Sequence, residues 1–329
     1  MVSATPIEIN DPRFEEQGFQ ILKVKPTFEY KRDINLWVTN NLLQSVKEVL
    51  AKVENKTCFL FCNSTDTIYT LMKQLNILDK SAVFCSDKSV DKLKGLKFKS
   101  AYSTWGENNM KHYNWLTSRF YNAVDIEINE CPNVLLLTDC YMAGYTIFDP
   151  NTDIIQCAGR FRNGITSLYL ISNVNNNFPV QNRDYLNGFI QCSKNIYDAT
   201  KCQYEQARNN KISQEAYKAV LDASPFRQYI TPEGKINYFA IDNYIDNELI
   251  KGIYNCKENL YRAFCPNDFF NVVSYQTNFY KLGDYERLCR ENKSNSLKEK
   301  RKTIVEQLEL LGDCETEMDF AFKEVLRKA

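Results

Sequence analysis

The sequence has little of what metal sites and disulfide frameworks need. It contains a single histidine, His112, and no Cys-x-x-Cys pair; among its 12 cysteines, Cys58 and Cys62 are the closest two. A zinc site built from cysteine and histidine is therefore not expected, and we expect no bound metal. Several cysteines lie in apolar runs, where a free thiol behaves as a small apolar side chain. This usage indicates a reducing, cytoplasmic compartment.

Long apolar runs and an excess of charge of one sign are also absent. No run approaches the ~20 apolar residues that span a bilayer, so we expect no membrane partner. Residues 1–6 have neither the basic nor the apolar region of a signal peptide. The 41 Lys and Arg residues balance 41 Asp and Glu residues. Zero net charge removes the bulk electrostatic argument for nucleic-acid binding, but it is compatible with a local basic groove.

What the sequence does contain is a series of buried strands. Continuous apolar runs bounded by polar residues are typical of strands covered on both faces, as in a parallel sheet. They occupy residues 57–62, 81–85, 113–117, 133–138 and 166–171. Apolar residues at helical spacing predict helices over residues 36–53, 68–75 and 154–160. The alternation predicts an α/β fold with a doubly wound parallel sheet, and places ligands at the carboxyl ends of the strands.

The chain length of 329 residues favours about two domains of ~150 residues each. Residues 1–35 contain three prolines and predict an extended arm or linker. Residues 36–178 form the predicted α/β domain, and residues 179–329 an all-helical domain. The helices that we expect in the latter are placed at residues 180–209, 212–221, 241–250, 296–311 and 318–326.

Three short segments can carry chemistry. The first runs from Thr117-Ser118 to Asp125-Ile126, and places hydroxyls directly after a strand. The second is Gln156-Cys-Ala-Gly159-Arg160-Phe-Arg162-Asn, whose two arginines suit contacts to phosphate oxygens. The third, Ser3-Ala4-Thr5, is too short to argue alone. Taken singly, each has an ordinary structural explanation: a capped loop, or a pair of solvated arginines.

Taken together and in order, these segments resemble the second half of a superfamily-two (DEAD/DEAH-like) helicase, in a form similar to helicases of mobile elements and phage. Ser3-Ala4-Thr5 resembles motif III, and residues 59–65 resemble motif IV, the first strand of the second RecA-like domain. Residues 117–126 resemble motif V, and residues 156–163 resemble motif VI with its arginine fingers. The resemblance covers residues 1–175 and implies a RecA-like, P-loop NTPase type of fold.

The resemblance also implies roles for individual residues. The catalytic residues that face the γ-phosphate would be Gln156, Arg160 and Arg162. Asp125 and Gly159 would lie at the nucleotide. Contacts to the nucleic acid would come from hydroxyl residues at the strand ends: Thr117, Ser118, Ser64, Ser86 and Ser89. Interdomain coupling would involve Ser3 and Thr5.

Two positions depart from the family pattern. Ala123 stands where motif V usually has glycine, and motif VI is shortened to Gly-Arg-x-Arg-Asn. In addition, the phosphate-binding Gly-x-x-x-x-Gly-Lys-Ser/Thr loop does not occur, and the apolar run that ends at Asp139 continues with Cys140 instead of the Glu of a magnesium site. We therefore expect the chain to be the carboxyl-terminal half of an ATP-dependent helicase, with no ATP hydrolysis of its own.

Under this interpretation ATP and Mg²⁺ belong to the full-length protein, and no cofactor is bound by this part alone. The expected partners are nucleic acid, DNA rather than RNA, and the missing amino-terminal RecA-like domain. Two alternatives stay open: a non-catalytic nucleic-acid-binding module on a RecA-like fold, and an interaction protein whose helical part recruits a partner. Alanine at Arg160 and Arg162 distinguishes the helicase motor from the binding module, because a motor loses hydrolysis whereas a binding module loses affinity and its salt dependence.

Overall fold

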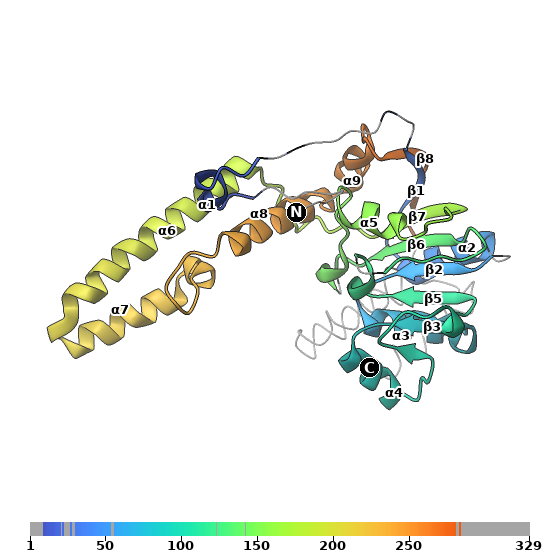
Figure 1. Ribbon diagram of the computed structural model, residues 1–329, viewed down its shortest axis with the longest axis horizontal. Helices are drawn as coiled ribbons and strands as arrows, with labels where there is room; N and C mark the ends of the chain where they lie inside the picture. The colour runs from blue at the N-terminus through green and yellow to red at the C-terminus, as the bar shows by residue number, and fades with distance from the viewer. Residues whose placement is uncertain are drawn as a thin grey trace. The chain divides into compact units, whose positions relative to one another are not determined.

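The computed structural model describes residues 9–20, 22, 27, 30–53, 56–122, 124–141, 143–280 and 283. The chain divides into two units (Figure 1). One comprises Glu29–Asn176 and Tyr254–Ala329 and is called the α/β unit below. The other comprises Met1–Phe28 and Asn177–Ile253 and is called the helical unit. The helical unit is thus built from two separate stretches of chain, and not from one carboxyl-terminal segment.

Among its described residues, the α/β unit contains one sheet of eight strands, all of them parallel, in the order β4-β3-β5-β2-β6-β7-β1-β8. The strands are β1 (Arg32–Thr39), β2 (Cys58–Phe61), β3 (Ser81–Phe84), β4 (Ala101–Tyr102), β5 (Tyr113–Leu116), β6 (Asn133–Thr138), β7 (Ser167–Ser172) and β8 (Phe270–Asn278). The prediction of an α/β fold with a parallel sheet is confirmed.

The strands predicted from continuous apolar runs are confirmed at β2, β3, β5, β6 and β7. Every residue of β2, β3 and β6 is buried, as expected for strands covered on both faces. The helix predicted over residues 36–53 is wrong in its first part, because residues 32–39 form β1 and helix α2 spans only Leu42–Lys52. The run Ile34-Asn-Leu-Trp-Val38 fits a strand between two neighbours, and Asn41 then caps α2 by accepting a hydrogen bond from the Gln44 N–H.

The prediction that residues 179–329 are all helical is wrong for residues 270–278. They form β8, which pairs in parallel with β1, from Arg32 opposite Phe270 to Thr39 opposite Asn278. The register shifts between Ile34 and Asn35, which indicates a bulge in this pair. The strand Phe270–Asn278 alternates between more and less exposed residues, a pattern of period two that favours a strand. The expected arm over residues 1–35 likewise contains α1 (Pro12–Glu16) and the start of β1.

The two faces of the sheet are filled differently. On one face α2, α3 (Thr65–Gln74) and α4 (Asp87–Gly95) pack against Cys58, Leu60 and their neighbours in one apolar cluster. Phe59 alternates with these residues and therefore points to the opposite face. There its ring contacts Phe161 at 4.9 Å and Trp105 at 5.7 Å between centroids. An aromatic layer thus covers the face on which the candidate site is built.

The helical unit contains α6 (Arg183–Gln206), α7 (Lys211–Ala223) and α8 (Tyr238–Ile253). Figure 1 shows α6 and α7 as a hairpin of two long helices. The buried cluster of this unit comprises Leu186, Ile190, Phe226, Tyr229, Ile241 and Ile245. Among the residues that the structure describes, no helix has the length and apolar character needed to cross a membrane.

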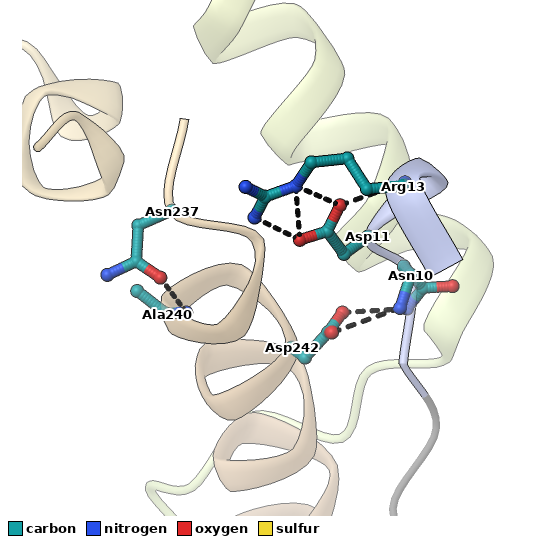
Figure 2. A network of polar contacts seen from close by, with 6 residues as sticks. All are labelled: Asn10, Asp11, Arg13, Asn237, Ala240 and Asp242. Atoms are coloured by element: carbon teal, nitrogen blue, oxygen red, sulfur yellow. Dashed lines mark hydrogen bonds and ion pairs between the residues drawn. The ribbon is translucent and has the colours of Figure 1, made fainter. Parts of the chain in front are cut away.

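The amino-terminal stretch is anchored on α8 by a buried carboxylate (Figure 2). Asp242 is 1% exposed. It accepts hydrogen bonds from the Asn10 backbone N–H at 3.1 Å and from the Asn10 side-chain amide at 2.7 Å. Asp11 forms an ion pair with Arg13 beside this contact, and Asn237 caps α8 by accepting from the Ala240 N–H at 3.1 Å. A buried polar group requires such partners, so the two bonds from Asn10 hold this stretch on α8.

Several of the predicted features lie outside the described residues. They are Ser3 and Thr5 of the motif III segment, Ala123 of the motif V segment, and the helices expected over residues 296–311 and 318–326.

Candidate functional site at the carboxyl edge of the sheet

The carboxyl ends of all eight strands meet at one edge of the sheet, because every strand runs in the same direction. The connection that follows β2 leads to β3 on one side of the sheet, whereas the connection that follows β6 leads to β7 on the other. Since β2 and β6 are neighbours, they flank a topological switch point, which is where open α/β sheets bind ligands. The candidate site is therefore defined by the loops that leave β2, β5 and β6.

The first of these loops begins with Thr117 and Ser118, directly after β5. Thr117 is buried, and its hydroxyl donates to the Phe84 carbonyl at 3.4 Å. Ser118 is exposed, and its backbone N–H donates to the Asn63 side-chain oxygen at 3.2 Å. Of the two predicted contacts in this loop, Ser118 is thus the one whose side chain reaches solvent.

The remaining predicted hydroxyls serve local structure. Ser64 is 5% exposed and caps α3, where its hydroxyl accepts hydrogen bonds from the Thr67 N–H at 3.2 Å and from the Thr67 hydroxyl at 2.9 Å. Ser86 precedes α4, and its hydroxyl donates to that of Ser89 at 3.1 Å. Both arrangements are those of helix amino-termini.

The arginine segment brings its predicted members together. Gln156 lies in α5 (Asp153–Gly159), and Arg160 follows at the end of this helix. Arg160 donates from Nε to the Gln156 carbonyl at 3.0 Å and from Nη2 to the Gln156 side-chain oxygen at 3.1 Å. Its third group, Nη1, donates to the Asn122 carbonyl at 3.3 Å and lies 3.6 Å from the carboxylate of Asp125. Arg162 completes the cluster by its 2.6 Å contact to the same carboxylate.

Backbone pairing explains why residues so far apart in sequence converge. Ile126 and Phe161 form an isolated parallel bridge. The Ile126 N–H donates to the Arg160 carbonyl at 2.8 Å, and the Arg162 N–H donates to the Ile126 carbonyl at 3.4 Å. Phe161 is buried within the aromatic layer, against Phe59 and Phe61. The bridge therefore aligns both arginines with Asp125.

The arginines differ in their surroundings. The Arg160 side chain is 15% exposed, while those of Arg162 and Asp125 are about half exposed, at 50% and 48%. The layer below them is apolar: burial raises the pKa of the Asp153 carboxyl, and it raises the pKa of the Cys157 thiol well above its usual range. Arg160 thus lies closer to a buried layer than Arg162 does.

At Gly159 the structure leaves open space where a side chain would begin. A Cβ at this position would meet no heavy atom within 4 Å. Neither space nor an unusual backbone conformation therefore requires glycine here.

The structure adds residues that sequence reasoning missed. Asn63 joins two loops, because its oxygen accepts from Ser118 N–H and its amide nitrogen donates to the Tyr145 carbonyl at 3.2 Å. Asn173, after β7, accepts from the Cys140 N–H at 2.6 Å and donates to the Asp139 carboxylate at 3.0 Å. A polar residue directly after an apolar strand was the available signal for both asparagines. Nothing local indicated their partners.

Comparisons with known proteins add no assignment: no protein-family model and no curated protein matches the chain. The chemistry must be inferred from the cluster itself. Two guanidinium groups beside a glutamine amide fit contacts to phosphate oxygens. In the part of the chain that the structure describes, no three His, Cys, Asp or Glu residues gather in a way that could hold a metal ion. The two guanidinium groups share one carboxylate, that of Asp125, so the cluster keeps one net positive charge and favours an anion.

Proposed function

We propose that the chain provides the second RecA-like motor domain of an ATP-dependent nucleic-acid helicase, with DNA as the expected substrate. One observation carries this proposal. Gln156, Arg160, Arg162 and Asp125 converge beside the parallel sheet, and Arg160 also donates to Asn122 in the loop that begins with Thr117 and Ser118 after β5. The order of these segments along the chain is the order in which the helicase motifs occur.

In this proposal Arg160 and Arg162 contact the γ-phosphate of ATP that a preceding RecA-like domain holds with Mg²⁺. ATP supplies the phosphoryl group whose transfer to water drives the motor, and charge develops on its phosphate oxygens. An arginine finger placed there contributes a factor of about 10³–10⁵ to the rate. Gln156 accepts two of the three hydrogen bonds that Arg160 donates, and so orders the guanidinium group before a phosphate approaches.

The same contacts offer a route from nucleotide to nucleic acid. Arg160 donates to the carbonyl of Asn122, which lies in the loop that begins at Thr117 and Ser118. A movement of the Arg160 side chain towards a phosphate removes or changes this bond. In this proposal the nucleotide state therefore acts on the Asn122 end of the loop, while Ser118 stays bonded to Asn63.

The test compares hydrolysis with binding in a protein extended by about 150–250 residues encoded upstream, the size of one such domain. Replacing Arg160 by Ala is expected to lower ATP hydrolysis by about 10³-fold. Affinity for single-stranded DNA should change little. If the variant instead loses affinity and salt dependence together, the arginines hold nucleic-acid phosphates and the motor assignment is wrong.

A further inference from the structure

Tyr145 is an exposed aromatic side chain on a fixed turn. It lies in η4 (Gly144–Thr146), in the loop that leaves β6, and 62% of it is exposed. The next residue, Thr146, is 1% exposed. The Thr146 hydroxyl accepts from the Asp139 N–H at 2.8 Å and donates to the Ala143 carbonyl at 2.7 Å. The backbone of the turn is thus held by buried hydrogen bonds, while the ring of Tyr145 is left in solvent.

The turn is also tied to the loop after β5. One Asn63 amide group accepts from the Ser118 N–H and donates to the Tyr145 carbonyl, both at 3.2 Å. Asn63 follows β2 and Tyr145 follows β6, so this bond spans the switch point between the two neighbouring strands. The side-chain amide of Asn63 therefore links the backbones of Tyr145 and Ser118 and holds the two residues near each other.

This pairing matches the two requirements of single-strand recognition. An exposed hydroxyl and backbone groups at a strand end contact the sugar–phosphate chain without reading its sequence. An aromatic ring stacks on the face of any base, and this face is accessible only when the base is unpaired. A tyrosine on a rigid turn loses little conformational entropy when it stacks, because few of its torsions are still free.

We propose that Tyr145 is a stacking site for an unpaired base of a single-stranded nucleic acid whose backbone passes Ser118. The inference rests on the proposed function, since it names the form of nucleic acid that this edge of the sheet takes. It assigns the preference for single strands to one side chain outside the helicase-like segments. Duplex nucleic acid offers no base face to Tyr145 and gains nothing from it.

The experiment measures affinity by fluorescence anisotropy with the full 329-residue chain. The probes are a fluorescein-labelled oligothymidylate, an abasic oligonucleotide of the same length, and a duplex. Replacing Tyr145 by Ala should weaken oligothymidylate binding at least about five-fold, the lower end of base stacking on an aromatic side chain. Binding of the abasic strand should be unchanged, because its phosphates are intact. Tyr145→Trp should restore the affinity.

The matched control is Tyr185→Ala, which removes a tyrosine of similar exposure, 58%, from α6 of the helical unit. It should leave all three affinities unchanged. An equal loss for the oligothymidylate and the abasic strand, or no loss for either, overturns the stacking site while nucleic-acid binding itself stands. If the unaltered chain binds neither strand, the proposed function fails, and the stacking site fails with it.

Discussion

Truncation of Phe161 is the perturbation whose effect can be worked out most fully from the structure. Its side chain is 2% exposed. Its ring lies 4.9 Å from that of Phe59 and 6.3 Å from that of Phe61. Replacing a buried phenylalanine by alanine costs about 3–5 kcal/mol, through lost transfer free energy and the cavity left behind. The two edge-to-face contacts account for about 0.5–1.5 kcal/mol each within that sum. We therefore expect Phe161→Ala to lower the free energy of unfolding by about 3–5 kcal/mol.

Tryptophan fluorescence during urea denaturation is the appropriate assay. The chain has three tryptophans, Trp37, Trp105 and Trp115, and all three lie in the α/β unit. Their emission therefore follows the unfolding of the unit that contains Phe161, and not of the helical unit. The dependence on urea should keep its slope, because the surface exposed on unfolding is nearly the same in both proteins.

Arg162→Ala serves as the control at the neighbouring position. The Arg162–Asp125 ion pair is about half exposed on both sides, and such pairs contribute about 0–1 kcal/mol. A loss below about 1 kcal/mol for Phe161→Ala refutes the reasoning. So does an equal loss for both variants, because the residue between the arginines would then not be the anchor of the cluster.

Three further predictions concern serine and cysteine side chains that the structure places in different surroundings. Ser64→Ala should lower the free energy of unfolding by about 1 kcal/mol, because it removes a helix cap. Ser118→Ala should change the free energy of unfolding by no more than about 0.5 kcal/mol. Equal losses for the two variants in urea denaturation contradict the different roles of these serines. Burial raises the pKa of Cys85 from 9.0 to about 11 and that of Cys58 from 9.0 to about 12. These thiols therefore ionise at lower pH in the unfolded chain than in the folded chain. The free energy of unfolding should consequently fall as the pH rises above about 9. A free energy of unfolding that rises above this pH contradicts the burial of the two thiols. At neutral pH a thiol reagent should modify exposed Cys131 in the native chain, and Cys85 only on unfolding.

The strands at the centre of the sheet could be predicted because their local pattern admits one interpretation. The runs of β2, β3 and β6 are too short for helices and apolar throughout, which fits strands covered on both faces. The segment Ile34–Val38 is mostly apolar too, but α2 follows it closely. When the apolar residues of the strand and of α2 are counted together, their spacing resembles that of one helix. β8 was missed because a surface strand is recognised by its partner, and its partner β1 lies more than 200 residues earlier in the chain.

The site could be predicted only in part, for a similar reason. The arginine segment could be recognised from the sequence, because two arginines one residue apart after a glycine suit contacts to phosphate oxygens. Its alignment with Asp125 depends on the bridge between Ile126 and Phe161, which are 35 residues apart by their numbers. Asn63 lies within residues 59–65, which resemble motif IV, but no individual role was predicted for it. Its link between Ser118 and Tyr145 follows from the strand order, in which β2 lies between β5 and β6.

ATP hydrolysis by the extended protein, with and without single-stranded DNA, tests the central claim most directly. The account predicts no hydrolysis by the 329-residue chain alone. It predicts DNA-stimulated hydrolysis once the residues encoded upstream are included, and loss of this activity when Arg160 is replaced by Ala. An extended protein that hydrolyses no ATP, or one whose hydrolysis is unaffected by Arg160→Ala, would contradict the assignment of this chain as the second half of a helicase motor.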